Sequence, residues 1–158
     1  MKKFIVLSIV LLILAGFGIT SSAEVVTLLA DQTIEVGTLT VEVVGGNLEV
    51  TYTITAPWVL GETHLYVGDT APKKSAPGQF PYGPESPEYA EIVDGVKYTI
   101  DLADFVGILF IAAQAEVINP EEIDPDTELP IEETAWANGT QIRTGKNWAM
   151  YFSFVVAP

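Results

Sequence analysis

The sequence predicts an all-β protein, an antiparallel β-sandwich of about seven or eight strands. Three observations point to this class. Apolar and polar residues alternate along several stretches, glycine- and proline-rich turn signals separate the stretches, and no stretch shows a convincing 3.6-residue helical period. A closed β-barrel is the alternative architecture.

The first 23 residues have the three-part layout of a secretory signal peptide. Lys2 and Lys3 precede an apolar run from Phe4 to Ile19, and small residues lead up to Ala23. The run of 16 residues would span roughly 24 Å as a helix, against a bilayer core about 30 Å thick, which favours cleavage after Ala23 over an uncleaved anchor. We therefore expect residues 1–23 to be removed, residues 24–158 to form a single β domain, and the protein to be secreted or at the cell surface.

The first two expected strands cover residues 33–44 and 48–55, joined by a tight turn at residues 45–47. The second strand alternates most cleanly, with threonine and glutamate on the polar face. Period two with a polar outer face predicts a half-buried antiparallel strand. Its expected core face is Leu48, Val50, Tyr52 and Ile54.

A third strand is expected over residues 58–67, with Leu65 and Val67 on its apolar face. Residues 68–95 contain five prolines and four glycines, which predicts a long ordered loop because proline denies a sheet its backbone donor. The aromatic residues of this loop predict that it packs on the domain; they are Phe80, Tyr82 and Tyr89.

Three further segments complete the domain: a strand over residues 97–102, a buried strand over 107–118 and a last strand over 148–156. Residues 119–133 are acidic and broken by prolines, so they are expected to form a loop. The expected core face of the buried strand is Leu109, Ile111, Ala113, Ala115 and Val117.

The domain is strongly acidic and contains no cysteine. Residues 24–158 hold five basic residues against all 21 acidic ones, a net charge of −16. Such a surface repels phosphate backbones and anionic lipid, so no nucleic-acid partner is expected, and no membrane contact once the signal peptide is removed. Without cysteine the protein has no disulfides, thiol catalysis or thiolate metal sites.

The first candidate binding site combines Glu62 and His64, which lie two residues apart on one strand, with Gln114 and Glu116 on another. Side chains two residues apart share a face of a strand. A carboxylate beside an imidazole can bind a metal ion or act as an oriented base. The alternative interpretation is that these side chains face water or close a hydrogen-bond network.

The second candidate is a pair of tryptophans, Trp136 and Trp148, flanked by polar residues near strand ends. Tryptophan can stack on a sugar ring, and it is also an ordinary residue at the edge of a core.

The third candidate is an acidic loop with alternating carboxylates at Asp124, Asp126 and Glu128. Such a loop can coordinate calcium, the one cofactor that the sequence suggests. The glycine of an EF-hand loop is missing, and a solvated acidic loop is the alternative. Asn138-Gly139-Thr140 fits a glycosylation sequon.

No enzyme class is supported by a motif. The chain lacks a Gly-x-Ser-x-Gly elbow, a His-Glu-x-x-His helix and a phosphate-binding loop. A hydrolase that uses paired carboxylates would need only two of the 21 acidic residues and stays open as an alternative.

Five sequence blocks, in order along residues 47–155, resemble an uncharacterised module of secreted and surface proteins of microbes. The blocks are WxLxETHLxVG from Trp58, PGQFPY from Pro77, IAAxA from Ile111, ETAW from Glu133 and GKNWAxYF from Gly145. In that module a histidine often stands where this chain has Gln114. The resemblance implies an extracellular β domain and directs attention to Glu62, His64, Gln114, Glu133 and Trp136, but it implies no reaction.

Taken together, the sequence predicts an exported, non-catalytic β-sandwich that acts in binding or assembly at the cell exterior, with an extracellular protein or glycan as its partner. A calcium- or carbohydrate-binding module and a carboxylate-based hydrolase are the alternatives.

Overall fold

The computed structural model describes residues 23–103, 105, 107–145 and 147–157, so the predicted signal peptide lies, but for Ala23, outside the described residues. In the described part, the chain forms ten β-strands and one short 3₁₀ helix. Every strand pairing is antiparallel, which confirms the predicted class. The elements are β1 (Glu24–Ala30), β2 (Ile34–Val44), β3 (Asn47–Ile54), β4 (Val59–Gly68), η1 (Pro77–Gln79), β5 (Tyr89–Ile92), β6 (Gly95–Asp101), β7 (Gly107–Ile123), β8 (Pro130–Ala137), β9 (Thr140–Gln141) and β10 (Met150–Val156).

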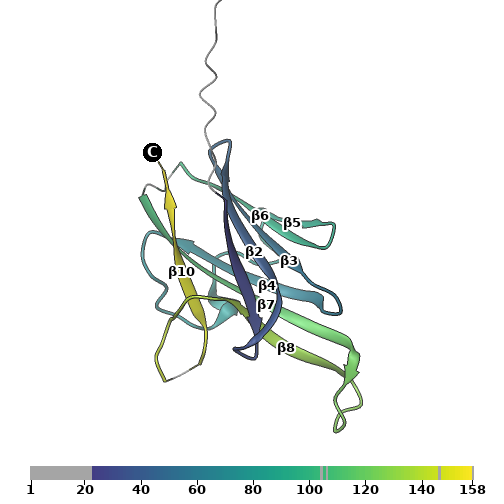
Figure 1. The fold of residues 1–158 in the computed structure, drawn as a ribbon. Helices are drawn as coiled ribbons and strands as arrows, with labels where there is room; N and C mark the ends of the chain where they lie inside the picture. The colour runs from purple at the N-terminus through teal and green to yellow at the C-terminus, as the bar shows by residue number, and fades with distance from the viewer. Residues whose placement is uncertain (1–22, 104, 106, 146, 158) are drawn as a thin grey trace, which may run out of the picture.

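The strands form two layers that share one hydrogen-bonded path (Figure 1). The path runs β5-β6-β3-β2-β1-β8-β7-β10-β9, and β4 pairs with β7. β1 joins the first layer, which consists of β5, β6, β3 and β2, to the second layer, which consists of β8, β7, β10, β9 and β4. Neither β9 nor β4 pairs with β5 among the described residues, so the sheet is not closed into a barrel. The sandwich is therefore the correct one of the two predicted architectures.

Two buried tyrosines connect the layers. The Tyr52 hydroxyl on β3 donates to the His64 carbonyl on β4 at 3.2 Å. The Tyr98 hydroxyl on β6 donates to the Thr63 carbonyl at 3.1 Å and lies 2.7 Å from Thr63 Oγ1. Two strands of the first layer, β3 and β6, thus face the backbone of β4 across the core.

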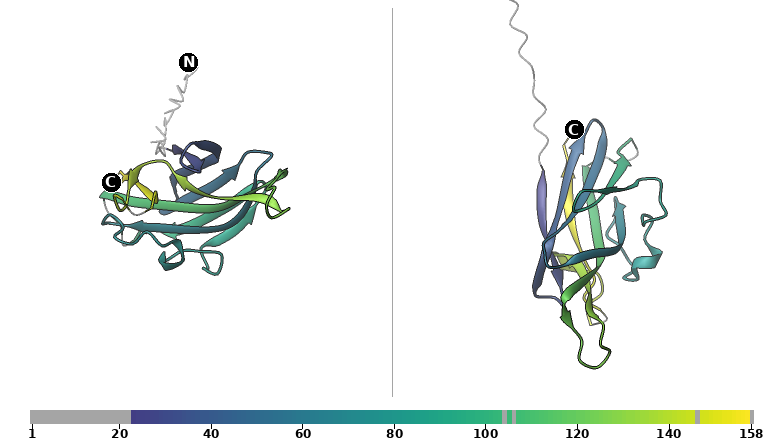
Figure 2. Two further views of the ribbon diagram at one scale, coloured as in Figure 1. Left: turned by 90° about the horizontal axis from the view of Figure 1, so that it is seen from below. Right: turned by 90° about the vertical axis from the view of Figure 1, so that its right-hand side faces the viewer.

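The predicted apolar faces form this core. Leu48, Val50 and Tyr52 of β3 are fully buried, as is the whole predicted face of β7. The predicted loop also packs on the domain. Two hydrogen bonds between the backbones of Leu65 and Tyr82, of 2.8 and 3.1 Å, attach it to the free edge of β4, and Figure 2 shows the segment outside the sheet.

β7 is the central strand of the second layer. One edge pairs with β4 over residues 110–118, and the other pairs first with β10 over residues 107–111 and then with β8 over residues 114–123. Because side chains alternate between faces, the core residues Ala113, Ala115 and Val117 leave Gln114 and Glu116 on the outer face.

The prediction of a loop over residues 119–133 is wrong in extent. β7 continues to Ile123 and β8 begins at Pro130, so the true turn is a short tip. The prolines do not break the strands because Pro120 lies at a register irregularity and Pro130 is the first residue of its strand. Both positions tolerate a missing backbone N–H. β1, β5, β8 and β9 were also not expected as strands.

No helix among the described residues is long and apolar enough to cross a membrane.

Candidate functional site

Three side chains form a row across the outer face of the second layer. His64 on β4 lies directly opposite Gln114 on β7, and Gln114 lies directly opposite Trp136 on β8. Directly opposed side chains on antiparallel strands have Cβ atoms about 5 Å apart. A second row beside it holds Glu116 and Thr134. The sheet register therefore brings together residues that are 72 positions apart along the chain.

This face forms the floor of a pocket of about 420 Å³. The walls come from the long loop after β4 and from the segment that leads into β10. The volume falls within the usual range for small-molecule sites. The lining residues are His64, Ser75, Pro77, Gly78, Gln114, Glu116, Thr134, Trp136, Asn147, Trp148 and Ala149.

Gln114 is a buried polar residue, with only 4% of its surface exposed. Its Oε1 lies 3.0 Å from Nδ1 of His64. With the amide oxygen facing the ring, His64 donates from Nδ1, and the neutral imidazole then carries its lone pair on Nε2. The side-chain nitrogen of Gln114 makes no hydrogen bond within the described residues, so it can donate to a ligand in the pocket.

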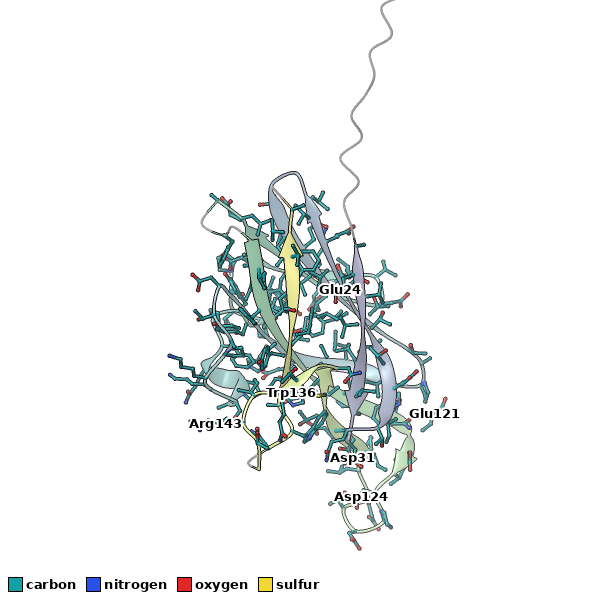
Figure 3. The ribbon with its side chains drawn as sticks, turned by 60° about the vertical axis from the view of Figure 1, so that its left-hand side comes forward. Glu24, Asp31, Glu121, Asp124, Trp136 and Arg143 are labelled. Carbon is teal, nitrogen blue, oxygen red and sulfur yellow. The ribbon has the colours of Figure 1, made fainter. Side chains whose placement is uncertain are left out.

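The two tryptophans of the pocket have different roles. Trp136 is 3% exposed and is held by Phe80, whose ring meets it edge-on at 6.0 Å. It thus belongs to a small apolar cluster with Ala112 and Ala149 under the loop, and it contributes to the wall rather than presenting an open ring face. Trp148 is only half-buried, so it is the aromatic side chain of the pocket that a ligand can stack on. Figure 3 shows Trp136 beside the loop that leads into β10.

Asn147 joins the two walls. Its side-chain nitrogen donates to Ser75 Oγ at 3.1 Å, and its carbonyl accepts a hydrogen bond from Gln141. The two loops at the mouth of the pocket are thus fixed to each other, which reduces the ordering that a ligand would have to impose.

Two of the predicted site residues lie outside this pocket. Glu133 lies opposite Val117, whose side chain is in the core, so it faces away from Trp136 and the pocket. Glu62 lies at a register irregularity in β4, is exposed, and does not line the pocket. The structure therefore brings together His64, Gln114, Trp136 and Trp148.

The acidic candidate loop is the turn between β7 and β8, which Figure 3 shows with Asp124 at its protruding tip. Asp124 Oδ1 accepts the backbone N–H groups of Asp126 and Thr127 at 2.8 and 2.9 Å, and these bonds hold the pKa of Asp124 below its usual value. The carboxylate thus serves to shape the turn. The part of the chain that the structure describes contains no group of three His, Asp or Glu side chains placed to hold a metal ion.

Sequence reasoning did not identify Ser75, Thr134 or Asn147 as pocket residues. Thr134 and Asn147 lie inside the ETAW and GKNW blocks, so the resemblance contained a usable signal for both. Ser75 lies in the irregular loop, where no periodicity indicates which residue turns inward.

No protein-family model, curated protein or solved structure matches this chain.

Proposed function

We propose that this protein is an exported, non-catalytic β-sandwich that binds a carbohydrate residue in the pocket formed by His64, Gln114, Glu116, Asn147 and Trp148. The observation that carries the proposal is that the pocket combines one accessible aromatic side chain with several polar side chains, which include both hydrogen-bond donors and acceptors. A sugar offers the matching surface: an apolar C–H face for the tryptophan, and hydroxyl groups that both donate and accept.

The polar groups supply this double capacity. The Gln114 amide nitrogen donates, the Glu116 carboxylate accepts, and the Thr134 hydroxyl does either. A buried or half-buried group that pairs with a ligand hydroxyl discriminates strongly against ligands that lack it.

The number of carboxylates in the pocket favours a binding function over glycoside hydrolysis. Glu116 is the single carboxylate among the described lining residues, whereas glycoside hydrolysis usually employs two, placed across the scissile bond.

The test is a titration of the domain, residues 24–158, with a panel of neutral and acidic mono- and oligosaccharides, followed by calorimetry and by tryptophan fluorescence. Glu116→Gln should weaken binding about tenfold or more, since a hydrogen bond to a charged group contributes about 1.5–3 kcal/mol. Trp148→Ala should also weaken binding, because it removes the ring on which the sugar would stack. Glu128→Gln removes the same charge at the distant hairpin tip and should leave the affinity unchanged. A folded wild-type domain that binds no saccharide at millimolar concentration would refute the proposal.

A further inference from the structure

The sandwich has a second pocket at its opposite edge, where β5 and β6 approach the start of β4. Its volume is about 470 Å³. One wall is the β5–β6 hairpin and the other is the segment from Ala56 to Gly61. Its lining includes two aromatic and two acidic side chains, Trp58, Tyr89, Glu91 and Asp94.

Aromatic rings stand on both walls of this pocket. Tyr89 pairs with the buried Tyr98, so its side chain faces the interior, and the Tyr98 ring meets it edge-on at 5.6 Å. Trp58, on the other wall, is half-buried and packs against the core. Both rings are therefore held in place without a ligand.

Carboxylates lie next to these rings. Glu91 pairs with the buried Val96, so strand alternation turns its side chain to the same face as Tyr89. Burial and, second to it, the nearby Glu91 carboxylate raise the pKa of Tyr89, which agrees with this placement. Asp94, in the hairpin turn, adds a second carboxylate to the lining.

No basic side chain among the described residues neutralises this pair. The nearby Lys97 forms an ion pair with Glu49 instead, at 3.0 Å, and neither residue lines the pocket. Lys97 pairs with Ala90, whose side chain points to the opposite face of β5 from Glu91. Within the described part of the chain, the lining of the pocket holds no lysine, arginine or histidine.

We infer that this second pocket binds an organic ammonium ion, held between the faces of Trp58 and Tyr89 with Glu91 and Asp94 as its counter-charges. Aromatic faces attract cations, most strongly when the ring is tryptophan and the site is partly desolvated. The net charge of −16 on residues 24–158 raises the local concentration of cations around the domain. The alternative role for Glu91, a charge on the edge strand β5, is to prevent edge-to-edge association between sheets, and that role requires no ligand.

The test compares choline with 3,3-dimethyl-1-butanol, which has the same shape without the charge, in NMR titrations of the domain. Choline should perturb the Trp58 indole signal and bind about two- to thirtyfold more tightly than the neutral isostere, the range to which a cation–π attraction of about 0.5–2 kcal/mol corresponds. A parallel titration with Nα-acetyl-lysine amide distinguishes a free ammonium compound from a lysine side chain of a partner protein; the source is whichever binds more tightly.

Glu91→Gln should weaken choline binding severalfold while the fold, checked by circular dichroism, stays intact. Glu128→Gln is the control with the same loss of charge, and Trp148→Ala shows that the effect does not come from the first pocket; both should bind choline like the wild type. The inference is overturned if the neutral isostere binds as tightly as choline, if Glu128→Gln weakens binding as much as Glu91→Gln, or if the folded protein binds no ammonium ion at all.

Discussion

Tyr98→Phe removes one hydroxyl from the interior and should destabilise the protein measurably. That hydroxyl donates to the Thr63 carbonyl at 3.1 Å and lies 2.7 Å from Thr63 Oγ1, and both residues are at most 1% exposed. Removing it leaves buried polar groups of Thr63 without this partner. Each such group costs about 1–3 kcal/mol, so we expect a loss of about 2 kcal/mol in the free energy of unfolding.

The size of the pairwise interaction follows from a double-mutant cycle with Thr63→Val. This single change removes only the threonine hydroxyl and should cost about 1 kcal/mol, because Tyr98 can still donate to the Thr63 carbonyl. In the double variant neither hydroxyl is left unpaired. It should therefore cost about 1 kcal/mol less than the sum of the two single changes, a typical coupling for residues in contact.

Urea unfolding followed by tryptophan fluorescence measures these differences in the free energy of unfolding. An unchanged m-value shows that a variant exposes the same amount of surface on unfolding as the wild type. Tyr151→Phe is the matched control, because the Tyr151 hydroxyl makes no hydrogen bond within the described residues and its removal should change stability by less than about 0.5 kcal/mol. A cost for Tyr98→Phe equal to that of the control, or a double variant that equals the sum of the single variants, would refute the reasoning.

Burial, opposed by the hydrogen bond from Thr63 and assisted by Tyr89, raises the pKa of Tyr98 to about 12. A raised pKa means that the unfolded state loses this proton first, so unfolding monitored against pH should show stability falling between about pH 10 and pH 12, and less steeply in Tyr98→Phe. Gly37→Ala should prevent folding or lower the melting temperature severely, because its Cβ would overlap the Thr53 carbonyl oxygen, whereas Gly78→Ala meets open space and should melt like the wild type. Asp124→Ala should open the β7–β8 turn and speed its amide exchange and proteolysis, while the asparagine variant, which keeps the accepting oxygen, should not.

Much of the fold could be predicted because its strands are half-buried and therefore alternate. The faces of β3, β6 and β7 follow directly from period two. β1 and β5 were missed for different reasons: Val25 to Leu29 is apolar except for Thr27 and shows no alternation, and β5 is four residues long inside a proline-rich segment. The extent of β7 was underestimated because the effect of Pro120 depends on the local register, which only the paired strand determines.

The candidate site could be predicted only in part. His64 and Gln114 were singled out as polar residues on strand faces, and the register places them directly opposite each other. Glu133 was grouped with Trp136 by adjacency in the sequence, yet an odd separation along a strand sends two side chains to opposite faces. The pocket walls depend on where two irregular loops meet, through Asn147 and Ser75, and no local pattern encodes that contact.

The alternation along β7 has an evolutionary consequence. Gln114 and Glu116 face the pocket, while Ala113, Ala115 and Val117, between and beside them, face the core. Substitutions at the two outward positions would therefore change the lining of the pocket without altering the packing beneath. One strand thus allows the pocket to vary while the interior stays the same.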